Sequence, residues 1–410
     1  MDYKTLINTY GSPLYVYDYK ILKERCQQIA DFASTLQNSL HRKITINMHY
    51  STKANYNPHL LKIVKETGLK VDCMSPLEVK VNELAGFTPE QMLYVCNNVT
   101  SEEMEFIHQK NILPCLDSIS QVESWGKLFP NSEIMVRVNP GTTGVGHSEK
   151  VITSGKVTKF GISEPNIPSL LATCEKYHLS IIGTHQHLGS LFLDDKIDDY
   201  IAGVEAGLNI SGEYFKNLKI IDLGGGFGVP YKESESPLNL KLVAEKLTPI
   251  LNTFLDSHPN IIELKFEPGR FIPCESCKLI GTVTAIKHEN NINWIGTDIG
   301  MNALVRPSMY DAYHHISIIS DNTEQITANV CGNICESGDI LGKQRFLTQP
   351  AVGDLVIIDN AGAYGYSMSS NYTGRVRGAE ILIKDNKATV IRQRESVDDI
   401  LKNIPPSPTH

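Results

Sequence analysis

The sequence of 410 residues contains no apolar run that approaches the roughly 20 residues needed to cross a bilayer. Its first residues, MDYKTLINTY, show no basic segment followed by an apolar one. It also has no long block of one charge sign, because 38 basic and 46 acidic residues, a net charge of -8, are spread along the chain. This pattern favours neither nucleic acid nor an anionic membrane as a partner. We therefore expect a cytoplasmic protein that binds neither.

Cysteine is sparse and irregularly placed, with nine residues scattered between positions 26 and 335. An odd number of cysteines in a chain of this size is typical of reduced thiols rather than of a disulfide framework. The pairs Cys274/Cys277 and Cys331/Cys335 could be read as a zinc site, but the second spacing is loose. Both pairs also stand in strand-rich sequence without the knuckle-like turns of zinc sites. We therefore predict no metal.

Short apolar runs rich in β-branched residues alternate with stretches of helical spacing from residue 44 onward. We count eight such runs, and seven of the eight intervals can hold a helix. The runs are Ile44–Tyr50, Leu69–Met74, Met92–Cys96, Ile112–Leu116, Glu133–Asn139, Ser180–His187, Leu218–Leu223 and Ile262–Glu267. Eight strand-helix units predict a parallel (β/α)8 barrel of the TIM type, with an open doubly wound sheet as the alternative.

After residue 278 the texture changes to strand-like runs without helical stretches between them, such as DLVIIDN and ATVIRQR. These runs predict a second, antiparallel β domain, either a sandwich or a barrel. The segment PLYVYD near residue 14 is also strand-like and could join this domain. We accordingly expect a barrel over residues 30–275 and a β domain made of residues 1–29 and 276–410.

The unusual residues of the barrel segment stand where its predicted strands end, and reacting groups gather at the carboxyl ends of barrel strands. Lys53 follows the first strand. Such a lysine either reaches solvent or, in a partly desolvated site, forms a Schiff base with an aldehyde. Three consecutive glycines, 224 to 226, follow the seventh strand. Their backbone N–H groups either bind a phosphate or simply form a tight turn.

Glu267 ends the eighth strand, where a carboxylate would be costly without a positive partner. That partner is either Arg270 or a protonated pyridine nitrogen, which the carboxylate would keep protonated so that the ring takes up electrons. His185 and His187 lie two apart on the predicted sixth strand and so share one face, which permits a metal site, stacking on a flat cofactor or plain structural roles. We favour stacking by His187, with Ser190 available to a phosphate, because no well-placed set of further metal ligands accompanies the histidines.

Taken with these residues, the chain resembles the diaminopimelate decarboxylases, pyridoxal-phosphate enzymes of a wider family that holds ornithine and arginine decarboxylases and shares its barrel with alanine racemase. The match runs from PLYVYD to about residue 400. Its most specific parts are DIGMNALVRPSMYDAYHHI, CGNICESGDILG and DNAGAYGYSMSSNYTGR. The resemblance implies decarboxylation of meso-2,6-diaminopimelate to L-lysine and carbon dioxide, the last step of lysine biosynthesis. It also implies a head-to-tail homodimer with active sites at its interface.

The resemblance further implies a role for individual residues. Lys53 would carry pyridoxal 5'-phosphate as a Schiff base, and Cys335 would return a proton to the α carbon, contributed across the dimer together with Glu336. The other cofactor contacts would be His187, Ser190, Gly224, Gly225, Gly226, Glu267, Gly269, Arg270 and Tyr364. The substrate contacts would be Arg270, Arg306, Tyr310, Glu336 and Tyr364, with guanidinium groups on the distal carboxylate and Glu336 on the distal amine.

Two segments near the implied site deserve comparison with the family pattern. The loop GTTGVGHSEKVITSGKVTKFGIS keeps the family's GHS and KFGI pieces, which predicts an ordered lid over residues 140–165. The usual SNYNSRPR reads SNYTGRVR here, a departure in the detail of one loop. The alternatives are a decarboxylase of ornithine, arginine or carboxynorspermidine, a racemase, a metal-dependent barrel hydrolase, and a non-catalytic regulator. A racemase would need a second base facing Lys53, and a regulator would usually have lost Lys53 or Cys335.

Overall fold

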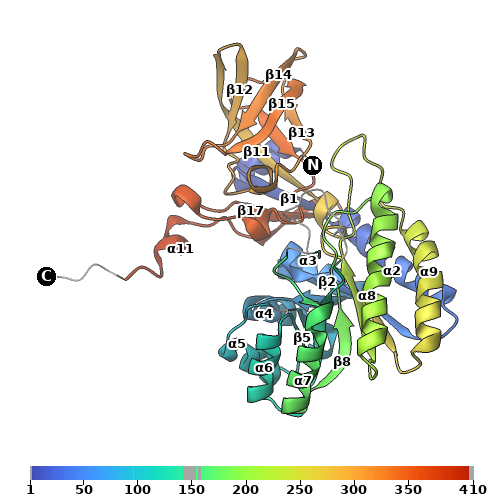
Figure 1. Cartoon of the computed structure of the whole chain (residues 1–410). Helices are drawn as coiled ribbons and strands as arrows, with labels where there is room; N and C mark the ends of the chain where they lie inside the picture. The colour runs from blue at the N-terminus through green and yellow to red at the C-terminus, as the bar shows by residue number, and fades with distance from the viewer. Residues whose placement is uncertain (1, 96, 142–153, 156–157, 406–410) are drawn as a thin grey trace. The chain divides into compact units, whose positions relative to one another are not determined.

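A computed structural model describes residues 2–95, 97–141, 154–155 and 158–405 (Figure 1). The chain divides into two compact units, Lys23–Ile272 and a second one that combines Met1–Leu22 with Pro273–His410. Helix α2 spans Tyr19–Ser39, so it contains the domain boundary expected between residues 29 and 30. The predicted lid lies largely outside the described residues. Among the described residues, every helix is too short or too polar to span a bilayer.

The unit Lys23–Ile272 is a closed barrel of eight parallel strands, which confirms the predicted (β/α)8 barrel over the open sheet. Neighbouring strands follow the order β5-β4-β3-β2-β10-β9-β8-β6, and β5 pairs with β6 to close the barrel. The barrel strands are β2 (Thr45–Ser51), β3 (Lys70–Cys73), β4 (Met92–Val95), β5 (Leu113–Leu116), β6 (Glu133–Asn139), β8 (Ser180–His185), β9 (Ile220–Gly225) and β10 (Glu263–Glu267). A two-residue strand, β7 (Ile162–Ser163), pairs with β6.

Seven helices follow the first seven barrel strands in the described part of the chain (Figure 1). They are α3 (Pro58–Glu66), α4 (Pro76–Ala85), α5 (Ser101–Gln109), α6 (Ile119–Leu128), α7 (Ile167–Tyr177), α8 (Ile197–Tyr214) and α9 (Leu240–Ser257). Short 3-10 turns are η1 (Thr52–Ala54), η2 (Pro89–Gln91), η4 (Glu164–Asn166) and η5 (Asp194–Lys196). Several helices begin where an Asn, Ser or Thr side chain accepts a hydrogen bond from a first-turn N–H. These capping residues are Asn57, Ser75, Thr100, Ser118 and Asn239.

The predicted sixth strand is two residues too long, because β8 ends at His185. The backbone N–H of Gln186 still donates to the carbonyl of Asp222 at 3.0 Å, and the chain then leaves the ladder. His187 therefore lies beyond the strand, and the inference that it shares a strand face with His185 is wrong.

The second unit is a nine-stranded sheet with short helices. Its strands are β1 (Leu14–Asp18), β11 (Cys277–Glu289), β12 (Ile292–Thr297), β13 (Ile316–Ile319), β14 (Gln325–Cys331), β15 (Ile340–Thr348), β16 (Leu355–Ile358), β17 (Ala379–Lys384) and β18 (Lys387–Arg392). Its helices and turns are α1 (Tyr3–Tyr10), η6 (Cys274–Ser276), α10 (Arg306–Tyr310), η7 (Tyr366–Met368), η8 (Tyr372–Gly374) and α11 (Val397–Leu401). Strand β1 lies between β11 and β17, so the N-terminal strand does pair within this unit.

The expectation of an antiparallel domain needs a correction, because the sheet is mixed. Strand β1 pairs in parallel with β17, and β12 pairs in parallel with β14. The other pairings described in this unit are antiparallel. Apolar alternation reveals that a segment is a strand but not the direction of its partner, so the sequence pattern could not separate the two cases. A buried cluster that includes Leu14, Ile280, Ile357 and Ile381 forms a core beneath the sheet.

Candidate active site

Lys53 stands in the η1 turn that directly follows strand β2. The turn is tied to the next strand-helix unit by buried side chains. Ser51 donates from Oγ to Asp72 Oδ2 at 2.7 Å. Thr52 Oγ1 lies 3.2 Å from Oδ1 and 3.1 Å from Nδ2 of Asn82. These bonds fix the turn at the carboxyl end of β2, where Lys53 itself is only partly buried.

Glu267 ends strand β10 and is 3% exposed. Its Oε2 lies 3.0 Å from Nε2 of His185, which is also buried. Burial raises the pKa of Glu267 to about 6, opposed by the nearby positive charge of Lys53, and burial lowers the pKa of His185 to about 3. Because an ionised carboxylate only accepts, His185 donates to it from Nε2 in that state. The other oxygen, Oε1, is buried and has no hydrogen-bond partner among the described residues.

Among the other charged residues buried in barrel strands, the strand pattern did not single out Asp72, Arg137 and Asp222. Burial, and then the negative charge of Glu267, raises the pKa of Asp72 to about 7 and that of Asp222 to about 8. Arg137 Nη1 lies 3.8 Å from Asp117 Oδ2. A signal for them exists in the sequence, because each is a charged residue inside an otherwise apolar run: KVDCM, IMVRVN and IIDLGG. Burying so many ionisable groups has a high cost in free energy. We therefore interpret the carboxyl ends of the barrel strands, called the rim below, as a functional site and not as ordinary core.

The glycine run at the end of β9, in which Gly224 and Gly225 are the last residues of the strand, is packed so closely that side chains would not fit. A Cβ atom on Gly224 would lie 2.2 Å from the carbonyl oxygen of Gln186, and one on Gly225 would lie 1.9 Å from that of Glu267. The amide of Gly224 donates to Asp222 Oδ1 at 2.9 Å. The run therefore brings its backbone directly against β10 and against the loop after β8.

The amide of Gly225 donates to Nδ1 of His187 at 2.9 Å, so that nitrogen is an acceptor and the ring is not doubly protonated. Burial and the neighbouring charge of Lys53 keep the pKa of His187 well below its usual value. The carbonyl of Gly226 accepts from the N–H groups of Leu191 and Phe192, at 2.9 and 3.0 Å, which joins this loop to the one after β8. The amides of Gly224 and Gly225 already donate to groups of the protein. An anion that binds at this run would therefore contact the backbone from Gly226 onward.

Arg270 links the three loops that follow β8, β9 and β10. The residue is 5% exposed, and it donates from Nη2 to Ser190 Oγ at 3.0 Å and from Nη1 to the Tyr231 hydroxyl at 2.9 Å. Gly269 is buried in the turn that leads into it, where its carbonyl accepts from the N–H of Ile272 at 3.3 Å. A buried guanidinium beside a hydroxyl and a glycine loop is suited to holding a phosphate.

The second unit holds the remaining predicted residues. Arg306 opens helix α10 and is 1% exposed, and Tyr310, at the end of that helix, is half-buried. Cys335 and Glu336 are exposed in the loop between β14 and β15. Buried Asp339 shapes this loop, accepting from the N–H of Ile334 at 2.8 Å with one carboxylate oxygen. The fold thus presents a thiol and a carboxylate side by side on a fixed loop.

Tyr364 has a strained backbone, with a φ of 58° that bulky residues rarely adopt. The turn around it is tightly packed: a Cβ atom on Gly362 would lie 1.8 Å from the carbonyl oxygen of Pro273, and one on Gly365 would lie 2.2 Å from that of Ala361. Strain of this kind persists where the surroundings enforce it, and it is concentrated at functional sites. The half-buried ring of Tyr364 is therefore placed by its neighbours and not by local preference.

One group of described residues could offer ligands to a metal ion: His185, Asp222 and Glu267, whose candidate atoms lie within 4.8 Å of one another. The 3.0 Å contact between His185 and Glu267 has the length of a hydrogen bond. We therefore interpret this group as hydrogen-bonded side chains and not as a set of metal ligands. The four cysteines weighed as a zinc site are not part of any such group among the described residues, and Cys274 and Cys277 are buried thiols. The prediction of no metal stays a prediction.

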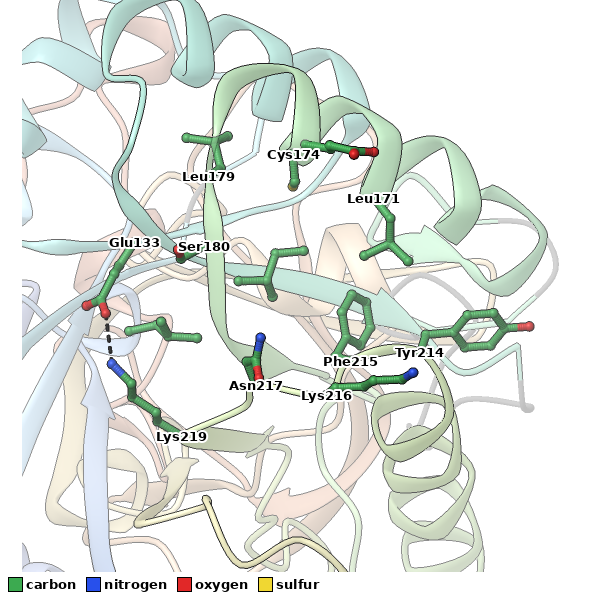
Figure 2. A pocket seen from close by; sticks show the side chains of 13 residues that line it. Glu133, Leu171, Cys174, Leu179, Ser180, Tyr214, Phe215, Lys216, Asn217 and Lys219 are labelled. Carbon is green, nitrogen blue, oxygen red and sulfur yellow. Dashed lines mark hydrogen bonds and ion pairs between the residues drawn. The ribbon is translucent and has the colours of Figure 1, made fainter.

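A separate cavity of about 380 Å³ lies at the opposite end of the barrel, at the starts of β6 and β8 and just before β9 (Figure 2). Its wall includes the ion pair between Glu133 and Lys219, which measures 2.8 Å, together with Cys174. No predicted site residue is among the described residues that line it. The amino-terminal face of such barrels serves stability and not catalysis. We therefore do not regard this cavity as the candidate active site.

The rim at the carboxyl ends of the strands fits a flat, phosphorylated cofactor. Lys53 supplies an amine, and the buried Oε1 of Glu267 has room in its hydrogen bonding for a ring N–H. The Gly226 loop and the Ser190–Arg270 pair lie together at the ends of β8 to β10, where they suit a phosphate. These are the parts that pyridoxal phosphate needs.

Comparisons with known proteins agree with this chemistry. Residues 26–273 match the family model of the pyridoxal binding domain of pyridoxal-dependent decarboxylases. The diaminopimelate decarboxylase of Methanothermobacter thermautotrophicus is 34% identical over 98% of this chain and 94% of its own length. Two solved diaminopimelate decarboxylases in complex with L-lysine also superpose. The M. jannaschii enzyme has a TM-score of 0.89, 26% identity and coverage of 99% and 95% of the two chains. The Helicobacter pylori enzyme has a TM-score of 0.85, 28% identity and coverage of 98% of each chain.

The family match covers more than half of the chain, and the similarity to the curated relative extends over nearly all of it. Fold, rim chemistry and sequence similarity thus lead to one conclusion. The chain belongs to the pyridoxal-dependent decarboxylases, and among them to the diaminopimelate decarboxylases.

Proposed function

We propose that this protein decarboxylates meso-2,6-diaminopimelate to L-lysine and carbon dioxide, the last step of lysine biosynthesis, with pyridoxal 5'-phosphate bound covalently to Lys53. The observation that carries the proposal is the rim at Lys53. There a fixed lysine stands among buried charges, near a glutamate with one buried oxygen that makes no hydrogen bond with a described residue. The similarity to diaminopimelate decarboxylases over nearly the whole chain supplies the substrate.

Lys53 would hold the cofactor through Nζ. When bound, the cofactor supplies an electron sink for the charge left as the carboxylate departs. Glu267 would keep the ring nitrogen of the bound cofactor protonated, while His185 holds Oε2 of the carboxylate. A positive partner favours the ionised form of Glu267, against the burial that raises its pKa.

The remaining rim residues orient the cofactor. His187, fixed by the amide of Gly225, stacks against the ring. Ser190, Gly226 and Arg270 bind the phosphate, supported by Gly224, Gly225, Gly269 and Tyr364. The bond from Arg270 to Ser190 keeps both groups in place before the phosphate arrives.

The residues of the second unit recognise the substrate and return the proton. Arg306 and Tyr310, with Arg270, bind the carboxylate away from the reacting carbon, and Glu336 binds the distal amine. Tyr364 contacts both phosphate and substrate. A thiol is largely protonated at neutral pH, so Cys335 can donate a proton to the α carbon. Each charge-assisted bond to the distal carboxylate contributes about 1.5–3 kcal/mol, which selects against lysine and ornithine as substrates.

We further propose a head-to-tail homodimer in which Cys335 and Glu336 serve the active site of the other copy. The exposure of both residues in the single chain agrees with that role. We also propose a cytoplasmic location, consistent with the free thiols of the cysteines that the structure describes.

Product analysis with a panel of amino acids tests the assignment. We expect lysine from meso-diaminopimelate, and little product from ornithine, arginine or carboxynorspermidine. Arg306→Ala should lower kcat/KM for meso-diaminopimelate by orders of magnitude, because the distal carboxylate loses its guanidinium partner. Preferential turnover of another diamine precursor, or no turnover at all, would reject this function in favour of a related decarboxylase or a regulator.

A further inference from the structure

Arg306 is 1% exposed, which is unusual for a side chain whose charge ordinarily stays in water. Its Nη1 lies 2.8 Å from Nε2 of His314, which is fully buried as well. Between them the chain turns back at Asp311, where helix α10 ends with a left-handed φ of 51°. The local fold therefore brings the imidazole directly against the guanidinium.

The hydrogen bonds fix the protonation state of His314. A guanidinium has only donors, so Arg306 donates and Nε2 of His314 accepts. On the other side of the ring, Nδ1 lies 2.8 Å from the carbonyl oxygen of Asp359, which can only accept. Nδ1 must carry the hydrogen, and the ring is neutral in a single tautomer with both nitrogens engaged.

The carbonyl that anchors His314 belongs to a rigid part of the sheet. Asp359 follows strand β16, and its N–H donates to the carbonyl of His315 at 3.0 Å, next to the antiparallel pairing of β13 with β16. The carboxylate of Asp359 also pairs with Lys278 of strand β11. The imidazole is thus a rigid link from the sheet to Arg306.

We propose that His314 is a positioning residue that holds the guanidinium of Arg306 in one orientation for the distal carboxylate of the substrate. This inference rests on the proposed function, because it takes from there the role of Arg306. A carboxylate that binds a guanidinium in a bidentate manner needs the guanidinium plane fixed. Loss of His314 should therefore weaken recognition of the carboxylate far more than it affects the cofactor.

The test compares three variants of the full-length holoenzyme. His314→Phe keeps a flat ring but removes the acceptor, His314→Gln keeps one acceptor and one donor, and His315→Phe alters the exposed neighbour as a matched control. We measure kcat and KM for meso-diaminopimelate, the equilibrium affinity for L-lysine and for cadaverine, and the cofactor absorbance. L-lysine retains the carboxylate that Arg306 is proposed to bind, whereas cadaverine has none.

We expect His314→Phe to raise KM and to weaken L-lysine binding by roughly 10- to 100-fold, as misplacement of a binding group typically does. The affinity for cadaverine and the cofactor absorbance should stay unchanged. His314→Gln should come close to the wild type, and His315→Phe should equal it. In the Arg306→Ala background, His314→Phe should cause no further loss, because its effect passes through Arg306.

The inference would be overturned by a His314→Phe enzyme that behaves like His315→Phe, or by one that loses cadaverine affinity as much as lysine affinity. An equal loss in the Arg306→Ala background would do the same, since it would indicate a purely structural role. Should the phenylalanine variant fail to fold, His314→Met, which also lacks a nitrogen acceptor, replaces it with the same expectations. A wild-type enzyme that makes no lysine from meso-diaminopimelate would instead refute the proposed function itself.

Discussion

At the barrel rim, three carboxyl groups are withdrawn from water close to one another: Asp72, Asp222 and Glu267. Burial is the main reason that their pKa values rise, to about 7, 8 and 6, and the charge of Glu267 adds to the effect on the other two. The folded protein therefore binds protons here that the unfolded chain releases near pH 4. A bound pyridinium would supply a positive charge near Glu267, so the same groups that are unfavourable without cofactor would suit the holoenzyme.

This proton binding predicts how stability depends on pH in the cofactor-free protein. Since the folded-state pKa values are raised, the stabilisation is complete below about pH 4 and is lost progressively as the pH rises from there through the folded-state values of about 6 to 8. Thermal unfolding should shift to lower temperature across that range, by roughly 1–2 °C for each kcal/mol lost in a chain of this length. Asp222→Asn keeps an acceptor for the amide of Gly224 but cannot ionise, so its unfolding temperature should fall less. Parallel pH profiles for the two proteins would show that Asp222 does not titrate as described.

The sequence indicated candidate site residues where they stand at the predicted end of a strand, as Lys53 and the glycine run do. The structure places both at strand ends. It did not reveal Asp72 or Arg137, because a single charged residue inside an apolar run does not disturb the strand pattern. Nor did it reveal His314, whose importance rests on a contact with Arg306 that only the folded chain makes.

At the scale of elements, the loops after β8 and β9 act as one piece. Their backbones meet where Gly224 and Gly225 approach neighbouring carbonyls too closely for any side chain. The amides of these glycines also fix Asp222 and His187. The glycine run therefore aligns the groups that we propose to stack on the ring and to bind the phosphate, beyond any direct contact with the anion.

This packing predicts that Gly224→Ala damages cofactor binding. Gly224 has a φ of 68°, and its new Cβ atom would lie 2.2 Å from the carbonyl oxygen of Gln186, so the loop must move. We expect the cofactor dissociation constant, measured by absorbance titration, to rise at least about tenfold. Gly68→Ala is the matched control, because Gly68 has a similar φ of 82° but nothing within 4 Å of the added atom. If both variants bind the cofactor equally well, backbone packing at Gly224 is not important.

Strand and helix positions followed from periodicity wherever capping residues and β-branched runs marked them, as in α3 to α6. Two features escaped the pattern for physical reasons. The end of β8 depends on where its ladder with β9 stops, which is a tertiary property. The parallel pairing of β1 with β17 joins segments from opposite ends of the chain, and local sequence says nothing about such partners.

At the scale of the whole molecule, each unit carries one part of the chemistry. The unit Lys23–Ile272 holds Lys53 and most of the residues proposed to bind the cofactor, and the other unit holds Arg306, Cys335, Glu336 and Tyr364. A division of this kind suits an enzyme whose copies exchange residues. The proposed dimer is supported by the family resemblance and by the exposure of Cys335.

Mixed dimers of two inactive variants test the exchange of residues. If Cys335 serves the other copy, a dimer of one Lys53→Ala chain and one Cys335→Ala chain contains one intact site. Random pairing makes half of the dimers mixed, so co-expression should restore about a quarter of the wild-type activity. The control is each variant expressed alone, which should be inactive or nearly so. Mixed dimers without activity would mean that Cys335 acts within its own chain or in no site.

The most direct test of the account is borohydride reduction of the purified holoenzyme, followed by peptide mapping. We predict that the cofactor becomes attached to the side-chain nitrogen of Lys53, that Lys53→Ala is not labelled, and that the unreduced wild type forms L-lysine from meso-diaminopimelate. Labelling at another residue, or none in the presence of added cofactor, would contradict the central claim that Lys53 holds the cofactor.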